Sequence, residues 1–186
     1  MSLLVLSGVS CVRGGRLLFE GLDLALAPGG AALVRGPNGA GKSSLLRIAA
    51  GLLAPAAGTV ARNEKAALAD EGAALDLRAP LAKALGFWAR LDGGSEEAGM
   101  AAMGLSHLAE APVRLLSAGQ LKRATLARVA ASGARLWLLD EPANGLDTDG
   151  MARLARMVAA HRKGGGAVIA ASHVPLDMEA AVEVNL

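Results

Sequence analysis

The chain has 186 residues, a hydrophobic fraction of 53% and a formal net charge of +2. This length predicts one domain with a full core, and the near balance of charge gives no indication of a nucleic-acid partner. The single cysteine, Cys11, excludes an intrachain disulfide, so we expect a buried thiol in a reducing compartment.

No apolar run approaches the roughly 18 to 20 residues that span a bilayer. The N-terminus also lacks the basic start and the cleavage site of a signal peptide. We therefore expect a cytoplasmic protein whose connection to a membrane, if it has one, is made through a partner.

The first third of the chain predicts strands followed by a helix. Residues 3–12 and 22–26 are β-type runs on either side of Gly14-Gly15, which predicts an antiparallel hairpin region. Residues 31–34 form a short apolar run typical of a buried strand, and residues 43–50 have a helical pattern. Strand, loop and helix thus follow one another.

A glycine-rich loop connects this strand to this helix. It reads Gly36-Pro37-Asn38-Gly39-Ala40-Gly41-Lys42-Ser43 and continues into Ser44. The spacing of glycine, four residues, glycine, lysine and serine is typical of a loop that wraps nucleotide phosphates, because glycine lets successive N–H groups point at an anion. We expect Lys42 to reach the β- and γ-phosphates and the Ser43 hydroxyl to bind Mg²⁺. The alternative is an ordinary glycine-rich turn.

The middle of the chain changes from strands to helices. Residues 59–62 and 66–69 predict short strands, and the segment from Glu71 to about Ala131 has helical spacing of its apolar residues. We interpret this segment as a helical insertion into a sheet-based core. We expect Phe87 and Trp88 to pack in the core, with a surface groove for a partner helix as the alternative.

The helical segment contains a second candidate anion site. The sequence Leu116-Ser117-Ala118-Gly119-Gln120 precedes a strongly helical run, residues 121–131. Ser117 and Gln120 are three residues apart, as in a capping box. A capped helix start beside Gly119 favours an anion as well, although such a motif alone is unspecific.

A predicted strand over residues 135–139 ends in Asp140 and Glu141. Adjacent carboxylates at the end of a buried strand need a partner, and a cation at the phosphate site supplies one. Asp140 fits a Mg²⁺ ligand. Because side chains alternate along a strand, we expect Glu141 to point the other way and to orient and deprotonate a water. The alternative is a structural acidic cap.

The last third predicts a turn over residues 144–147, a helix over residues 149–163 and a strand over residues 167–171. His173 follows that strand, in the place where open α/β sheets bind ligands. His107 and His161 have no such neighbours, and we expect both to be solvated.

The ordered set GPNGAGKSS, LSAGQ, LWLLDEP, NGLD and SH resembles the ATP-binding subunit of ABC transporters, over essentially the whole chain. Within that family the chain is similar to the ATPase of the haem exporter of cytochrome c biogenesis, the CcmA type. The resemblance implies an α/β fold with a P-loop NTPase core, a mixed sheet and an antiparallel β subdomain. It implies a single domain over residues 1–186, with residues 71–131 as its inserted helical subdomain.

The resemblance also implies a mechanism that uses ATP and Mg²⁺. Two copies would meet head to tail, with ATP between the phosphate loop of one and Ser117, Ala118 and Gly119 of the other. His173 would contact the γ-phosphate, and Asp147 would link the two sites. An integral membrane permease would be the partner, which implies a peripheral location on the cytoplasmic face of the inner membrane.

Two residues depart from the pattern of that family. Arg13 stands near the position of the aromatic residue that stacks on adenine, and Glu71 stands near the position of a glutamine that senses Mg²⁺ and the membrane partner. An arginine plane can stack on a base, and a carboxylate can bind Mg²⁺ through water.

Two other functions remain open at this stage. A soluble ABC-type ATPase acting on ribosomes or DNA usually needs tandem domains or a long coiled coil, and the chain has neither repeats nor sustained heptads. A protein that only senses nucleotide would not need the intact set of Lys42, Ser43, Asp140 and Glu141.

Overall fold

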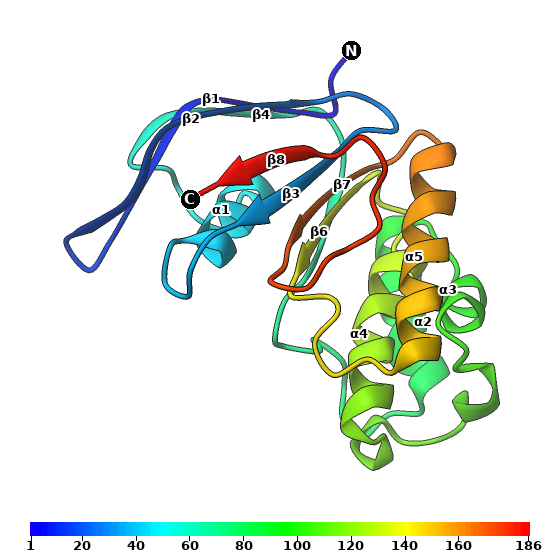
Figure 1. Ribbon diagram of the computed structural model, residues 1–186. Coiled ribbons are helices and arrows are strands. Elements are labelled where there is room, and N and C mark those ends of the chain that lie inside the picture. Colours follow the sequence, from blue (N-terminus) through cyan, green and yellow to red (C-terminus); the bar gives the residue numbers. More distant parts are fainter.

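The computed structural model describes residues 1–186 and divides the strands between two sheets (Figure 1). The elements in chain order are β1 (Leu4–Arg13), β2 (Arg16–Leu26), β3 (Ala31–Arg35), α1 (Lys42–Ala50), β4 (Ala57–Arg62), β5 (Ala66–Ala69), α2 (Leu81–Asp92), α3 (Glu96–Ala102), the 3₁₀ turns Ser106–Leu108 and Val113–Leu115, α4 (Ala118–Ala131), β6 (Leu136–Asp140), α5 (Thr148–Lys163), β7 (Ala167–Ala171) and β8 (Val182–Asn185). None of the helices has the length and the apolar composition needed to cross a bilayer.

The N-terminal strands form a 3-stranded sheet in the order β2-β1-β4. Both of its strand pairs are antiparallel, so the predicted hairpin is confirmed. β2 starts at Arg16, well before the predicted residue 22. Cys11 on β1 is 2% exposed, as expected for a small apolar side chain.

The second sheet is 5-stranded, in the order β5-β6-β7-β3-β8, and all of its pairs are parallel. The chain therefore has the expected P-loop α/β core with an antiparallel β part, but its parallel and antiparallel strands occupy separate sheets. Only β7 stands between β3 and β6. The loop after β3 and the acids at the end of β6 consequently lie at the same edge of the sheet.

Side chains of the parallel sheet alternate between two cores. Leu33, Trp137 and Val168 face a 23-residue core shared with α2, α4 and α5. Val34 and Leu138 face a 20-residue core shared with α1 and the antiparallel sheet. Because both faces are covered, β3, β6 and β7 are continuous apolar runs, which is why the sequence predicts them. Figure 1 shows α1 between the two sheets and the other helices on the opposite side.

The helical segment is shorter than predicted. Residues 71–80 contain no helix, and α2 begins only at Leu81, directly after Pro80. Pro80 disfavours a helical conformation in the residue before it, which explains the late start. The strand β8 was not predicted, because its Val182 and Val184 alternate with polar residues over only four positions.

The expectation for the aromatic pair was right for one residue and wrong for the other. Trp88 is half-buried and its indole Nε1 donates to the carbonyl of Ala74 at 2.8 Å. Phe87 is 56% exposed. Neighbouring residues of a helix point about 100° apart, so only one of the two can face the core. Phe87 instead lines a surface groove of about 370 Å³, together with Trp88 and residues such as Asp76, Lys83 and Arg90.

Candidate functional site

The glycine-rich loop takes a conformation that depends on its glycines. Gly41 has φ of 111°, in the left-handed region, and immediately precedes α1. A Cβ at Gly41 would lie 3.1 Å from the ring of Phe19 and from the side chain of Leu18. Both the backbone angle and the close approach of β2 therefore require glycine here.

Lys42 opens α1 and its ammonium is turned back toward the loop. Lys42 Nζ donates to the carbonyls of Gly36 at 2.9 Å and Pro37 at 3.2 Å. The lysine is only 7% exposed. The loop therefore holds a buried cation against its own carbonyls.

His173 joins this loop to the acidic end of β6. Its Nε2 lies 3.0 Å from Lys42 Nζ, 2.8 Å from Asn38 Oδ1 and 3.3 Å from Glu141 Oε1. The backbone N–H of His173 also donates to Glu141 Oε2 at 3.3 Å. One imidazole nitrogen thus lies among an ammonium, an amide oxygen and a carboxylate, and the structure places His173 beside the glycine-rich loop.

Glu141 reaches this position by a backbone conformation that the sequence did not reveal. β6 ends at Asp140, so strand alternation does not orient Glu141, contrary to our expectation. Its φ is 44°, one of the few positive values outside glycine, and its N–H donates to the carbonyl of Ala171 at 2.8 Å. Such strained conformations persist where the surroundings enforce them, and they occur often at functional sites.

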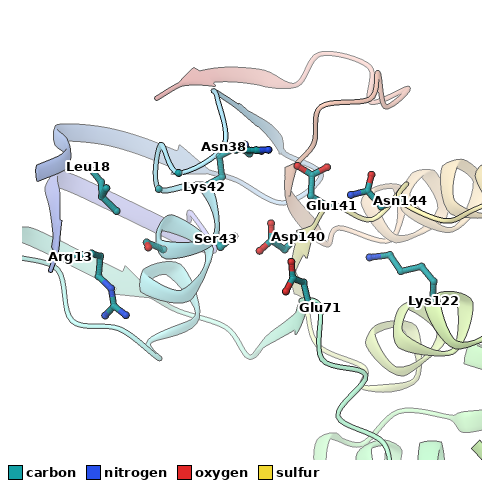
Figure 2. Close-up of a pocket in the computed structure, with 13 residues that line it drawn as sticks. Arg13, Leu18, Asn38, Lys42, Ser43, Glu71, Lys122, Asp140, Glu141 and Asn144 are labelled. Carbon is teal, nitrogen blue, oxygen red and sulfur yellow. The ribbon is translucent and has the colours of Figure 1, made fainter. Parts of the chain in front are cut away.

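These groups surround a polar cleft of about 720 Å³ (Figure 2). Its lining residues, which define the polar cleft from here on, are Arg13, Leu18, Asn38, Gly39, Gly41, Lys42, Ser43, Ser44, Glu71, Lys122, Asp140, Glu141 and Asn144. Ser43 and the 8%-exposed Asp140 therefore lie on one cavity. So do Arg13 and Glu71, the two residues that depart from the family pattern.

The other predicted binding residues gather elsewhere. A smaller pocket of about 160 Å³, which we call the helix-tip pocket, is lined by Ser117, Gly119, Gln120, Arg123, Gly145, Leu146 and Asp147. Ala118 does not line it. None of its residues lines the polar cleft, so the two parts of the predicted nucleotide site are separate within one chain.

Helix caps shape the helix-tip pocket. Ser117 Oγ accepts from the N–H of Gln120 at 3.3 Å, and Gln120 Oε1 accepts from the N–H of Ser117 at 2.8 Å, which confirms the predicted capping box. Asp147 caps α5 by accepting from the N–H of Gly150 at 2.8 Å. The N–H groups of Ala118 and Gly119 have no partner within the chain, so they are free donors at the start of α4.

Sequence reasoning missed Lys122, Asn144 and Leu18 as lining residues of the polar cleft. Lys122 lies in the second turn of α4 and Asn144 in the turn after Pro142. Because both residues lie far from the loop in the sequence, no local motif connects them to it. The same run also contains Arg123, Thr125 and Arg128, so the residue type of Lys122 gave no hint either.

His161 was wrongly expected to be solvated, whereas His107 is indeed exposed. The His161 ring stacks on Trp137, with centroids 3.6 Å apart and planes 8° apart. Its Nε2 lies 3.2 Å from the carbonyl oxygen of Arg135. Burial lowers the pKa of His161 below its ordinary value, although hydrogen bonds to the backbone of Arg135 and Ala167 oppose that shift.

The sequence matches the family model described as ABC transporter over residues 19–144. The chain belongs to the ABC transporter family of ATPases. The resemblance based on its motifs is thereby confirmed, and members of this family bind ATP, typically with Mg²⁺, and hydrolyse it.

Curated relatives share the same printed name, Cytochrome c biogenesis ATP-binding export protein CcmA. The protein of that name from Sphingopyxis alaskensis is 58% identical over 177 residues, which cover 94% of this chain and 91% of the relative. The one from Zymomonas mobilis is 54% identical over 172 residues, covering 91% and 78%. The narrower resemblance to the CcmA type is thus confirmed as well.

Solved structures agree on the fold. An ATP-binding subunit of an ABC transporter superposes with a TM-score of 0.88 at 20% identity, covering 100% of this chain and 86% of its own. An ATP-binding protein of a putative ABC transporter from Pyrococcus furiosus has a TM-score of 0.83 at 22% identity, covering 98% and 96%. At such identities the superpositions establish the fold.

Proposed function

We propose that the chain is the ATP-hydrolysing subunit of a transporter whose export activity serves cytochrome c biogenesis. One observation carries the chemistry: Lys42, Asp140 and Glu141 line a single polar cleft, and His173 bonds to its loop and acid sides at once. The export role rests on relatives such as the 58% identical protein from Sphingopyxis alaskensis, which is named Cytochrome c biogenesis ATP-binding export protein CcmA.

The polar cleft fits the triphosphate of ATP. Residues 36–44 supply backbone N–H groups and the start of α1, and Lys42 supplies a buried positive charge. Glu141 accepts the proton of the attacking water, and His173 contacts the γ-phosphate from the end of β7. Gly39, Ala40, Gly41 and Ser44 would bind the phosphates through backbone N–H groups or a hydroxyl, whereas Gly36 and Pro37 act through the carbonyls that hold Lys42.

The Ser43 hydroxyl and the Asp140 carboxylate would hold Mg²⁺. Both are oxygen donors on the polar cleft, as this hard cation requires. No group of three or more His, Cys, Asp or Glu residues forms a metal cage in the chain. This fits Mg²⁺, which is usually held by one or two carboxylates together with substrate phosphates. When bound, Mg²⁺ neutralises charge on the phosphate oxygens.

Hydrolysis requires a second copy of the chain in this proposal. The free N–H donors of Ala118 and Gly119 lie at the start of α4, and Gly119 lines the helix-tip pocket, which is separate from the polar cleft. A head-to-tail homodimer brings the cleft of one subunit to Ser117, Ala118, Gly119 and Gln120 of the other. An isologous dimer then has two equivalent composite sites, with Asp147 beside each.

A membrane permease fits the surface groove beside α2. The groove exposes Phe87 next to the half-buried Trp88 and lies directly after Glu71 in the chain. Exposed aromatic side chains in a groove are typical of helix-in-groove docking. Binding there places the ATPase peripherally on the cytoplasmic face of the inner membrane.

The substitution E141Q tests the nucleotide mechanism. It keeps the shape of the side chain but removes the base, so we expect hydrolysis to be lost and an ATP-bound dimer to accumulate. Size-exclusion chromatography with light scattering, with and without Mg-ATP, measures the dimer. E20Q, on the exposed part of β2, is the matched control and should hydrolyse ATP normally. A monomer under both conditions contradicts the shared site.

The substitution F87E tests the permease groove. It places a charge on the exposed aromatic surface, so we expect the membrane partner to be lost while the ATPase activity of the isolated chain is retained. Pull-down from detergent-solubilised membranes, compared with wild type and the exposed-lysine control K163Q, gives the answer. Recovery of ribosomal proteins in place of an integral membrane protein contradicts the transport role and favours a soluble ABC-type ATPase.

A further inference from the structure

Lys122 occupies a special place between the two parts of the site. It lies in the second turn of α4, is half-buried and lines the polar cleft. The next residue, Arg123, lines the helix-tip pocket, and its guanidinium Nη1 lies 3.9 Å from Oδ2 of Asp149. Adjacent residues of α4 therefore contact different pockets, and α4 forms the wall between them.

The Lys122 ammonium has no ion pair within 4.0 Å and no hydrogen bond within the chain. Figure 2 shows it extending from α4 toward the side of the cleft that holds Glu71, Asp140 and Glu141. A half-buried charge without a direct partner is costly unless opposite charges lie nearby. Those three carboxylates supply them.

The other cations of the polar cleft are placed differently. Lys42 is engaged by the loop carbonyls, and Arg13 lies at the far end of the cleft on β1 (Figure 2). Lys122 is thus the cation on the acidic side. Burial lowers its pKa, and the charges of Asp140, Glu141, Asp70 and Glu71 oppose that shift, which agrees with a lysine facing this acidic group.

We infer that Lys122 is a positioning residue that balances the charge of Glu71, Asp140 and Glu141 and thereby couples α4 to the hydrolysis centre of its own subunit. The inference rests on the proposed function. Because α4 is one continuous helix from Ala118 to Ala131, a displacement of Lys122 toward the acids also displaces the start of the helix at Ser117. In the head-to-tail dimer that tip contacts the nucleotide of the other subunit.

A lysine on an exposed helix surface should not affect the binding of MgATP, in contrast to Lys122. Lys163, in the last turn of α5, is exposed and lines no part of the polar cleft. It provides the matched control, since K163Q and K122Q remove the same charge from a helix. Only K122Q removes a positive charge from the acidic side of the polar cleft.

The kinetic test compares K122Q, K122R and K163Q in the full chain. We expect K122Q to raise KM for MgATP about tenfold, the size of one charge interaction near a protein surface. K122R should stay within about twofold of wild type because it keeps the charge. Equal KM values for K122Q and K163Q overturn the inference, and thermal unfolding checks that each variant is folded.

The double variant E71Q/K122Q tests whether charge balance is the cause. Removing one charge of each sign restores the balance, so KM should return to within about threefold of wild type. A loss equal to or larger than that of K122Q alone overturns the inference.

The coupling to the helix tip is measured with a non-hydrolysable ATP analogue and Mg²⁺, so that Glu141 keeps its charge. The analogue concentration for half-maximal dimerisation should rise about tenfold in K122Q and stay unchanged in K163Q. Unchanged dimerisation in K122Q overturns the coupling alone. If neither wild type with the analogue nor E141Q with MgATP dimerises, the proposed function fails instead, so the two failures are distinguishable.

Discussion

The polar cleft and the helix-tip pocket differ in what each contains. The cleft is about 720 Å³ and holds cations, acids and a glycine loop that curves around Lys42. The pocket is about 160 Å³ and holds capped helix starts whose side chains already satisfy each other. In the proposed function, the cleft binds the triphosphate and the pocket adds donors from the second subunit.

This difference assigns binding to one region and completion of the site to the other. Substitutions of the phosphate-binding residues of the polar cleft should lower the affinity of a single chain for nucleotide. Substitutions at the helix tip should leave that affinity and remove hydrolysis.

K42A should have the largest effect on nucleotide affinity. It removes the buried ammonium at the centre of the loop, and a hydrogen bond between charged groups contributes about 3 kcal/mol, or roughly a hundredfold in affinity. Titration with a fluorescent ATP analogue measures the loss, and K163Q again serves as the control. Affinity within a few-fold of wild type would show that the cleft is not the primary binding region.

S117R should separate binding from hydrolysis. A large charged side chain at the tip of α4 keeps the second subunit from closing, so hydrolysis should fall about a hundredfold, as expected when reacting groups are misplaced by about 1 Å. Nucleotide affinity of the single chain should stay within about twofold, because Ser117 does not line the polar cleft. A comparable loss of affinity would contradict the division between the regions.

Mixing the two variants makes that test sharper. A head-to-tail pair of K42A and S117R contains one intact site, formed by the cleft of the S117R subunit and the tip of the K42A subunit. Each variant alone has none. Activity should therefore reappear in the mixture, whereas an inactive mixture speaks against composite sites. The control is a mixture of K42A with E141Q, in which neither cleft is competent.

Much of the polar cleft could be predicted from sequence because its main parts are local. The spacing of Gly36, Gly41, Lys42 and Ser43 specifies the loop, and the apolar runs on either side specify its strand and helix. The capping box of Ser117 and Gln120 is local as well, since its partners are three residues apart. Local hydrogen bonds and periodicity require no knowledge of the tertiary fold.

The missed features depend on contacts between distant residues. Glu141 faces the cleft because its φ is 44°, which no alternation rule predicts. Lys122 faces the cleft only because α4 packs beside β5, and His161 is partly buried only because α5 places it on Trp137. β8 is a strand because β3 offers it an edge. Pairings of this kind follow from the packed structure, not from local sequence.

R13A should weaken the binding of ATP moderately, and only through the adenine base. Arg13 lies at the end of the polar cleft remote from the acids, where its guanidinium can stack on adenine (Figure 2). Losing about 1 kcal/mol of stacking should raise KM for ATP about fivefold. Inhibition by inorganic triphosphate, which has no base, should not change. R16A is the matched control, since Arg16 pairs with Arg13 across the hairpin but does not line the cleft.

H161Q should leave both regions intact and affect only the stability of the fold. The ring lies on Trp137 at the far end of β6 from Asp140, and losing an aromatic stack should lower the free energy of unfolding by about 1 kcal/mol at neutral pH. Urea unfolding measures this change. H107Q, at an exposed histidine, is the control and should unfold like wild type.

The pH dependence of the same variants tests the cause of the His161 effect. Its pKa is lowered in the folded chain, so the unfolded chain binds more protons as the pH falls below the ordinary value of 6.5. The stabilisation by neutral His161 is thus complete above that value and is lost as the pH falls through the folded pKa. Wild type and H107Q should therefore lose more stability on acidification than H161Q. If all three proteins lose the same stability, protonation of His161 does not contribute to the pH dependence of unfolding.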